Sequence, residues 1–152
     1  MEMSAAGLDL LKRSEGFRSH TYLDAAGFAT IGYGHQLLPN EFFSNGVTEA
    51  HAEEILLSDL RAAEQTVERL VRVALSQGQF DALVDLTFNL GAGKLASSTL
   101  LKELNAGQYD AAREQLLRWD HVGLQENAGL KARRQAEFEL WGSGGAQPEA
   151  AA

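Results

Sequence analysis

Two carboxylates and a hydroxyl lie close together in the N-terminal part of the chain. Glu15 is followed by Asp24 and Thr30 within the stretch SEGFRSHTYLDAAGFATIGYGH, residues 14–35. Two carboxyl groups in unlike environments can divide proton donation from charge stabilisation, which is what hydrolysis of a glycosidic bond requires. The residue types therefore indicate a glycosidase, provided that the fold places the two carboxylates so that they face the same space.

The surrounding pattern predicts a helix that ends at Glu15 and a β-hairpin after it. Ser4 can cap a helix that reaches to about residue 14, and Gly16 is suited to end it. Two short segments rich in β-branched and aromatic residues follow, at 17–23 and 28–33. We expect them to pair as antiparallel strands beside the helix end.

This arrangement predicts a different role for each of the three residues. Glu15 would lie at an apolar junction of helix and sheet, where burial raises the pKa of a carboxyl group and keeps it protonated as a general acid. Asp24 begins the polar turn between the strands and would stay ionised. The hydroxyl of Thr30, on the returning strand, can hold a water between itself and Asp24.

The same residues carry a resemblance to a known family. Asp24 follows Glu15 by nine residues and Thr30 follows Asp24 by six, at the start of the motif TIGYGH. This spacing and motif resemble the phage-type lysozymes of glycoside hydrolase family 24. Similar segments extend from about Leu8 to Trp141, and they include TFNLGAG at 87–93, STLL at 98–101, Arg118-Trp119, Gly129-Leu130, Arg133-Arg134 and Glu137.

The resemblance implies both a fold and a reaction. The fold would be α+β and mostly α, with a small β-hairpin lobe and a helical lobe joined by a long helix around a cleft. The reaction would be inverting hydrolysis of the β-1,4 bond between N-acetylmuramic acid and N-acetylglucosamine in peptidoglycan by a phage or prophage endolysin. Two alternatives are a lytic transglycosylase, which would not need Asp24 and Thr30, and a catalytically silent peptidoglycan-binding module.

Further residues are assigned to the site with the help of the resemblance. Glycines in the motif would allow backbone or sugar to approach closely, and the asparagine that ends the apolar helix at 79–90 would contact sugar N-acetyl or hydroxyl groups, unless it is only a helix cap. A histidine hydrogen-bonded to a neighbouring carboxylate and one of two arginines that orients the acid would support the site. The substrate-binding residues are then Gly32, Tyr33, Gly34 and Asn89, and the supporting residues are His35, Arg133 and Arg134.

The rest of the chain is expected to be helical. The segment 37–46 is predicted as a loop or an irregular third strand, and 122–129 as a loop. The predicted helices are 48–71, capped by Thr48; 79–90, apolar on nearly all sides and ended by 91–93; a short helix from 97 or 98 to about 107; one with Tyr109, Ala112, Leu116 and Trp119 on one face; and one with Leu130, Arg134, Phe138 and Trp141 on one side.

The domain boundary is expected near residue 142. Residues 1–142 would form one lysozyme-like domain, which suits the length of 152 residues. The composition then changes to Gly, Ser, Ala and Glu, which predicts a flexible tail over 143–152 that buries almost nothing.

Composition limits the partners and the location. The net charge is −8, so nucleic acid is not an expected partner, and the acidic residues between 41 and 70 are interpreted as a solvated helix face. The chain has no cysteine, and His20, His51 and His121 lack metal-ligand spacing, so no metal or cofactor is expected. With no signal peptide or membrane helix in the pattern, we expect a monomer that does not insert into membranes and waits in the host cytoplasm for a holin.

Overall fold

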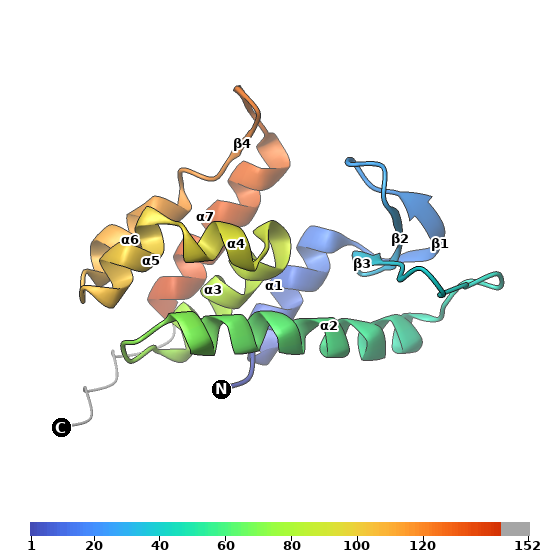
Figure 1. Ribbon diagram of the computed structural model, residues 1–152, viewed down its shortest axis with the longest axis horizontal. Helices are drawn as coiled ribbons and strands as arrows, with labels where there is room; N and C mark the ends of the chain where they lie inside the picture. Colours follow the sequence, from blue (N-terminus) through green and yellow to red (C-terminus); the bar gives the residue numbers. More distant parts are fainter. Residues whose placement is uncertain (144–152) are drawn as a thin grey trace. The chain divides into compact units, whose positions relative to one another are not determined.

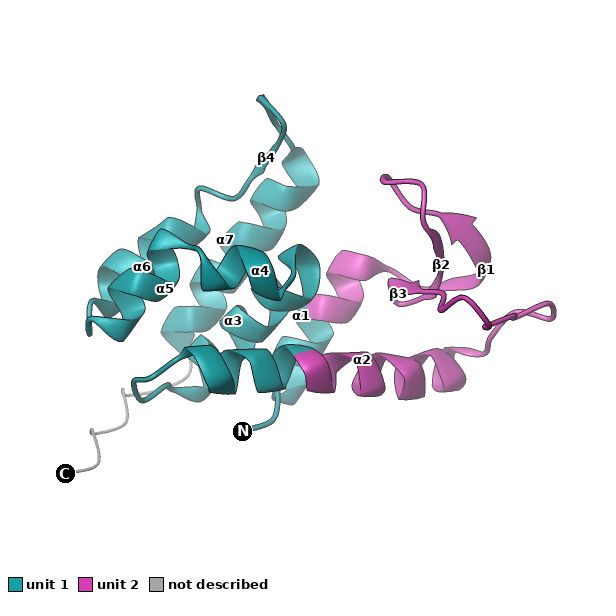
Figure 2. Ribbon diagram, in the orientation of Figure 1, with its two compact units in different colours: residues 1–10, 63–152 teal, residues 11–62 magenta. Residues whose placement is uncertain are grey.

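Helices account for most of the chain in the computed structural model, which describes residues 1–143 (Figure 1). The chain divides into two compact units (Figure 2). Unit 1 comprises Met1–Leu10 together with the chain from Ala63 onward, and unit 2 comprises Leu11–Ala62. The predicted α+β class with a predominance of helix is confirmed.

Unit 2 contains the end of the first helix and a three-stranded sheet. Helix α1 (Ala5–Glu15) ends because Gly16 adopts a left-handed conformation, with φ +71°, and donates its backbone N–H to the Lys12 carbonyl. Strands β1 (Arg18–Leu23), β2 (Ala29–Gly32) and β3 (His35–Gln36) then form an antiparallel sheet in the order β1-β2-β3. The predicted hairpin is confirmed, and the third strand lies just before the segment in which it was expected.

Helix α2 (Glu49–Leu70) carries the chain from unit 2 into unit 1. It begins where predicted, because the Thr48 hydroxyl accepts a hydrogen bond from the His51 backbone. None of its acidic residues is buried, which agrees with their interpretation as a solvated face. Six of the seven carboxylates between residues 41 and 70 nevertheless accept a hydrogen bond from another segment or form an ion pair with it; these are Glu41, Glu49, Glu53, Asp59, Glu64 and Glu68.

Unit 1 is built around helix α3 (Gln77–Leu90), which is buried from Gly78 to Thr87. It starts two residues earlier than predicted because Ser76 and Gln79 form a reciprocal capping box. Helices α4, α5, α6 and α7 complete the unit, and α3 packs against α4 and α7. Their bounds are Ala92–Ala96, Thr99–Asn105, Tyr109–Leu116 and Ala128–Ser143.

Three features of unit 1 differ from the predictions. Gly91, with φ +94°, ends α3 but is followed at once by the short helix α4. Part of the predicted loop is a small hairpin, β4 (His121–Val122) and β5 (Gln125–Glu126), which turns at Gly123 with φ +61°. Helix α7 then begins at Ala128, because the side chain of Asn127 accepts a hydrogen bond from the Leu130 backbone.

The C-terminal end of α7 lies close to the predicted domain boundary. The helix continues through Gly142 to Ser143, whose hydroxyl donates to the Leu140 carbonyl. The remainder of the predicted tail, 144–152, lies outside the described residues. In the part of the chain that is described, no helix is both long enough and apolar enough to cross a membrane.

Candidate active site

The carboxyl group of Glu15 lies against the backbone of Gly34. A Cβ atom built on Gly34 would be 2.9 Å from Glu15 Oε1 and 3.0 Å from its Cδ, both closer than an ordinary contact. Gly34 also has φ +73°, a conformation that residues with a side chain rarely adopt. The turn between β2 and β3 therefore requires glycine for two reasons, and one of them is the position of the proposed acid.

Both carboxylate oxygens of Asp24 accept hydrogen bonds from neighbouring residues. Its Oδ1 accepts hydrogen bonds of 2.9 Å from the backbone N–H groups of Ala26 and Phe28. Its Oδ2 accepts one of 3.2 Å from the side-chain amide of Gln36, on β3. The turn is thus closed by the side chain of Asp24 itself, which is what favours aspartate at the start of such turns.

Thr30 and Asp24 both form hydrogen bonds with the backbone of one residue, Phe28. The hydroxyl of Thr30 donates to the Phe28 carbonyl at 2.8 Å, and the same carbonyl accepts the backbone N–H of Asp24 at 2.9 Å. Phe28 therefore binds Asp24 through both its N–H and its C=O, and Thr30 through its C=O. Thr30 is only 2% exposed, so its hydroxyl is fixed by its surroundings.

The hydrogen bond to Phe28 determines what the Thr30 hydroxyl can still do. A hydroxyl has one hydrogen and two lone pairs. The hydrogen of Thr30 is used on the Phe28 carbonyl, so the oxygen is left as an acceptor. Asp24 is likewise an acceptor when ionised, and the two groups could accept the two hydrogens of one water.

The remaining residues of the TIGYGH motif hold unit 2 together. Tyr33 is 5% exposed and its hydroxyl donates to Glu49 at 2.8 Å; burial, followed by this hydrogen bond, raises the pKa of Tyr33 to about 12. Gly32, with φ +65°, lies against Ala52, where an added Cβ would be 3.1 Å from the alanine methyl group. These placements give Tyr33 and Gly32 packing roles, and their contact with sugar stays a prediction.

His35 bridges two carboxylates, so the expected hydrogen bond to a neighbouring carboxylate is present. Its Nδ1 lies 2.7 Å from Asp59 Oδ2 on α2, and its Nε2 lies 2.9 Å from Glu41 Oε1. Burial opposes protonation, but the two hydrogen bonds outweigh it, so the pKa of His35 is raised. The backbone N–H of Leu38, followed by His35, lowers the pKa of Glu41.

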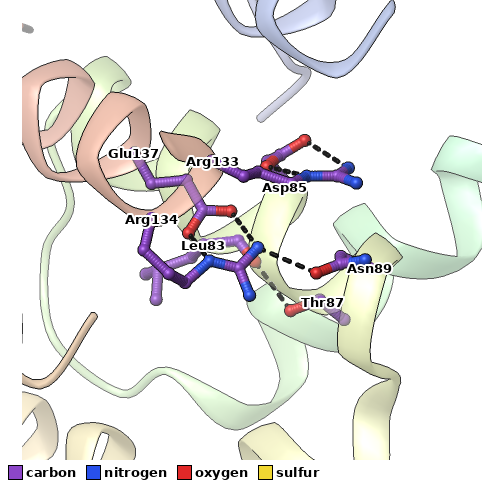
Figure 3. Close-up of polar contacts among 7 residues, drawn as sticks. All are labelled: Leu83, Asp85, Thr87, Asn89, Arg133, Arg134 and Glu137. Carbon is purple, nitrogen blue, oxygen red and sulfur yellow. Dashed lines mark hydrogen bonds and ion pairs between the residues drawn. The ribbon is translucent and has the colours of Figure 1, made fainter. Parts of the chain in front are cut away.

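The other predicted site residues lie in unit 1, in a buried polar cluster between α3 and α7 (Figure 3). Arg133 makes a bidentate ion pair with Asp85, at 2.9 Å for each hydrogen bond. Arg134 donates from Nη2 to both Asn89 and Glu137, again at 2.9 Å. Whether either arginine orients Glu15 stays a prediction.

The two carboxylates of this cluster have opposite pKa shifts. Burial, the hydrogen bond to Asp85 and the charge of Asp85 raise the pKa of Glu137 well above its usual range. Burial also acts on Asp85, but its hydrogen bonds with Glu137 and Arg133 outweigh burial and lower its pKa. The buried side chains of α7 are Arg133, Arg134, Glu137 and Trp141, whereas Leu130 and Phe138 are only half-buried.

One pocket in unit 1 is lined by residues of two further segments that resemble the family, STLL at 98–101 and Arg118-Trp119. Its volume is about 440 Å³. It combines two cations, three hydroxyls, an amide and an indole ring, and this chemistry suits a polar, acidic ligand. The lining residues are Lys94, Ser97, Ser98, Thr99, Leu100, Gln115, Arg118 and Trp119.

Two contributors to the site were missed from the sequence. Gln36 pairs with Thr30 in the β2–β3 register, and its position directly after the TIGYGH motif could have suggested a contact with the hairpin turn. Phe28 contributes through its backbone, which no residue type reveals. Of the predicted residues, Glu15, Asp24, Thr30, Gly32, Tyr33, Gly34 and His35 belong to unit 2, and Asn89, Arg133 and Arg134 belong to unit 1.

Comparison with known proteins shows which proteins the whole chain is similar to. A family model described as phage lysozyme matches residues 12–137. The endolysin of Salmonella phage P22 is 38% identical over 138 residues, which are 89% of this chain and 94% of that protein. The crystal structure of a P22 lysozyme mutant covers 94% of this chain and 99% of its own, with a TM-score of 0.83 and 38% identity. The endolysin of Bacillus phage B103 is also 38% identical, across 95% of this chain, but the chain spans only 55% of that protein.

Proposed function

Because this chain belongs to the phage lysozyme family and is a glycoside hydrolase of the lysozyme type, we propose that Glu15, Asp24 and Thr30 carry out its reaction. The substrate is the β-1,4 bond between N-acetylmuramic acid and N-acetylglucosamine in peptidoglycan, and the mechanism is inverting hydrolysis. The placement of Glu15 against Gly34 and the shared contacts of Asp24 and Thr30 with Phe28 support this assignment.

The steps follow from the acid and acceptor groups. Glu15 gives its proton to the glycosidic oxygen as the bond from that oxygen to the anomeric carbon breaks. A water donates one hydrogen to Asp24 and the other to Thr30, so that a lone pair of its oxygen is directed at the anomeric carbon. As the new bond forms, the water loses a proton to Asp24, and solvent later returns Glu15 and Asp24 to their starting states.

The observation that carries this proposal is the orientation of the Thr30 hydroxyl. Its hydrogen is on the Phe28 carbonyl, so it accepts from the water and does not compete with it as a donor. A lytic transglycosylase has no attacking water to hold, and a binding module has no need of a buried acceptor in this place. Hydrolysis is the function that uses all three residues.

Product analysis tests the proposal against its alternatives. Proton NMR of a fresh oligosaccharide digest should show the α-anomer first, because a single displacement by water inverts the anomeric carbon. An initial β-anomer would refute the inverting mechanism. Mass spectrometry of digested peptidoglycan should show reducing ends; anhydro ends would indicate a transglycosylase, and the absence of products a binding module.

The biological role that fits this chemistry is host cell lysis by an endolysin held in the cytoplasm until a holin opens the membrane. The net charge of −8 gives the protein no attraction to an anionic envelope from outside. Protein added externally should therefore clear Gram-negative cells whose outer membrane has been permeabilised and leave intact cells turbid. Equal clearing of both preparations would refute this interpretation of the charge.

A further inference from the structure

Gln36 lies beside the two groups that are proposed to hold the attacking water. It is the register partner of Thr30 across strands β2 and β3, which lie next to each other in Figure 1. Side chains of directly opposed residues project from the same face of a sheet. From this position Nε2 of Gln36 donates to Asp24 Oδ2 at 3.2 Å. One side chain thus connects Asp24 to the strand position opposite Thr30.

The orientation of the Gln36 carboxamide is determined by its partner. An ionised carboxylate accepts hydrogen bonds and has none to donate. The NH₂ end of Gln36 must therefore face Asp24, because the rotated amide would place its oxygen against a second acceptor. Gln36 is exposed, and among residues 1–143 its side chain makes no other hydrogen bond. The contact with Asp24 is therefore what places this side chain.

The hydrogen bonds of Asp24 leave little of its carboxylate available to a water. An ionised carboxylate has about four lone-pair positions, two on each oxygen. The backbone N–H groups of Ala26 and Phe28 fill those on Oδ1, and Gln36 fills one on Oδ2. No other group in the described part of the chain donates to Oδ2, so one position on that oxygen stays open. Loss of Gln36 would open a second position and divide the bound water between two sites.

We propose that Gln36 is a positioning residue that limits Asp24 to a single acceptor site for the attacking water. The proposal rests on the proposed function, in which Asp24 and Thr30 accept the two hydrogens of that water. It adds a residue that acts through Asp24 on the direction of the water and not on the affinity for the glycan. All the residues concerned belong to unit 2, so the site is contained in that unit.

Replacement of the amide donor tests the proposal. Gln36→Met keeps the length of the side chain and removes the donor, so it should lower kcat about tenfold, with KM within about twofold and an unchanged melting temperature. Gln36→Lys retains a donor and should keep kcat within about threefold of wild type. The matched control is Gln135→Met on α7, because Gln135 is also exposed and also donates from Nε2 to a carboxylate, Glu139, at 3.4 Å. The control should match wild type.

A double-mutant cycle tests whether Gln36 acts through Asp24. In Asp24→Asn the two backbone N–H groups keep the remaining oxygen of residue 24 on their side. The new NH₂ group then faces the NH₂ group of Gln36, and the hydrogen bond between the two side chains is lost. Adding Gln36→Met to Asp24→Asn should therefore change kcat by less than about twofold, because both substitutions remove the same contact.

Rates are measured on purified peptidoglycan strands at equal folded protein. An unchanged kcat for Gln36→Met would overturn the proposal, and so would a kcat as low for Gln36→Lys as for Gln36→Met. A raised KM with kcat kept would instead make Gln36 a substrate-binding residue, and a loss confined to the melting temperature would make it a structural contact; either result overturns the proposal. An equal loss of kcat in both backgrounds of the cycle would do so as well. Wild-type kcat in Asp24→Asn would refute the proposed function, whatever Gln36→Met does.

Discussion

Gly34→Ala tests whether Glu15 is held where the chemistry requires it. The new Cβ would lie 2.9 Å from Glu15 Oε1 and 3.0 Å from Cδ, whereas ordinary contacts begin near 3.4 Å. The carboxyl group must therefore move by roughly half an ångström, if the backbone does not. A displacement of about 1 Å at a reacting group costs on the order of 100-fold in rate, so we expect kcat/KM to fall by about 10- to 100-fold.

The substitution also strains the backbone, and this second effect needs a control. An alanine held at positive φ costs about 1–2 kcal/mol, which for a chain of this size lowers the melting temperature by about 2–8 °C. Gly107→Ala is the matched control, because Gly107 has φ +81° and an added Cβ there meets nothing within 4 Å. Both variants should lose similar stability, and only Gly34→Ala should lose activity.

The assay is hydrolysis of purified peptidoglycan at 25 °C, with melting temperatures measured by circular dichroism on the same samples. The comparison is made at equal folded protein, well below either melting temperature. If Gly34→Ala is as active as Gly107→Ala, the contact between residue 34 and the acid has no catalytic consequence. The assignment of Glu15 as the general acid would then lose its main geometric support.

Three other predictions follow from the site. Glu15→Gln should fold normally and lose nearly all activity, whereas turnover within tenfold of wild type would contradict its role as acid. Thr30→Val should lower kcat by about 100-fold because it removes the water's acceptor, and Thr30→Ser should keep most of the activity; equal rates would show that the hydroxyl is dispensable. Asp59→Asn should lower the free energy of unfolding by about 1–3 kcal/mol near pH 5.5, where His35 is charged. This loss of unfolding free energy should become smaller as the pH rises through the raised pKa of His35, because the histidine then loses its charge. Equal losses in urea titrations at pH 5.5 and at a pH above that pKa would contradict the ion pair.

Local signals in the sequence were sufficient for the end of the first helix, the hairpin turn and the long helix. Glu15 could be placed at a helix end because Gly16 follows it, and Asp24 at a turn because its side chain closes that turn. The long helix α2 followed from its apolar spacing and its cap at Thr48. Each of these depends on interactions within a few residues, which is why a pattern in the sequence can reveal them.

The charged interface of unit 1 could not be predicted in the same way. Of the four residues expected on one side of α7, Leu130 and Phe138 are only half-buried, Trp141 is buried, and Arg134 is buried together with Arg133 and Glu137. These charged residues can be buried only because Asp85 and Asn89, more than 40 positions earlier, supply their partners. Pairings at that separation depend on how α3 and α7 pack, and hydrophobic periodicity carries no information about them.

The role of Phe28 has a consequence for how this protein can be dissected by mutation. Its N–H and C=O hold Asp24 and Thr30, while its side chain is 57% exposed and takes no part in that contact. Scanning with alanine would leave both peptide groups in place and score the position as dispensable. Proline, or an ester in place of the amide, would remove the N–H that Asp24 accepts. The contacts that hold the two proposed catalytic residues are thus made by the main chain of residue 28, so replacing its side chain does not detect them, and substitutions at this position should do little harm.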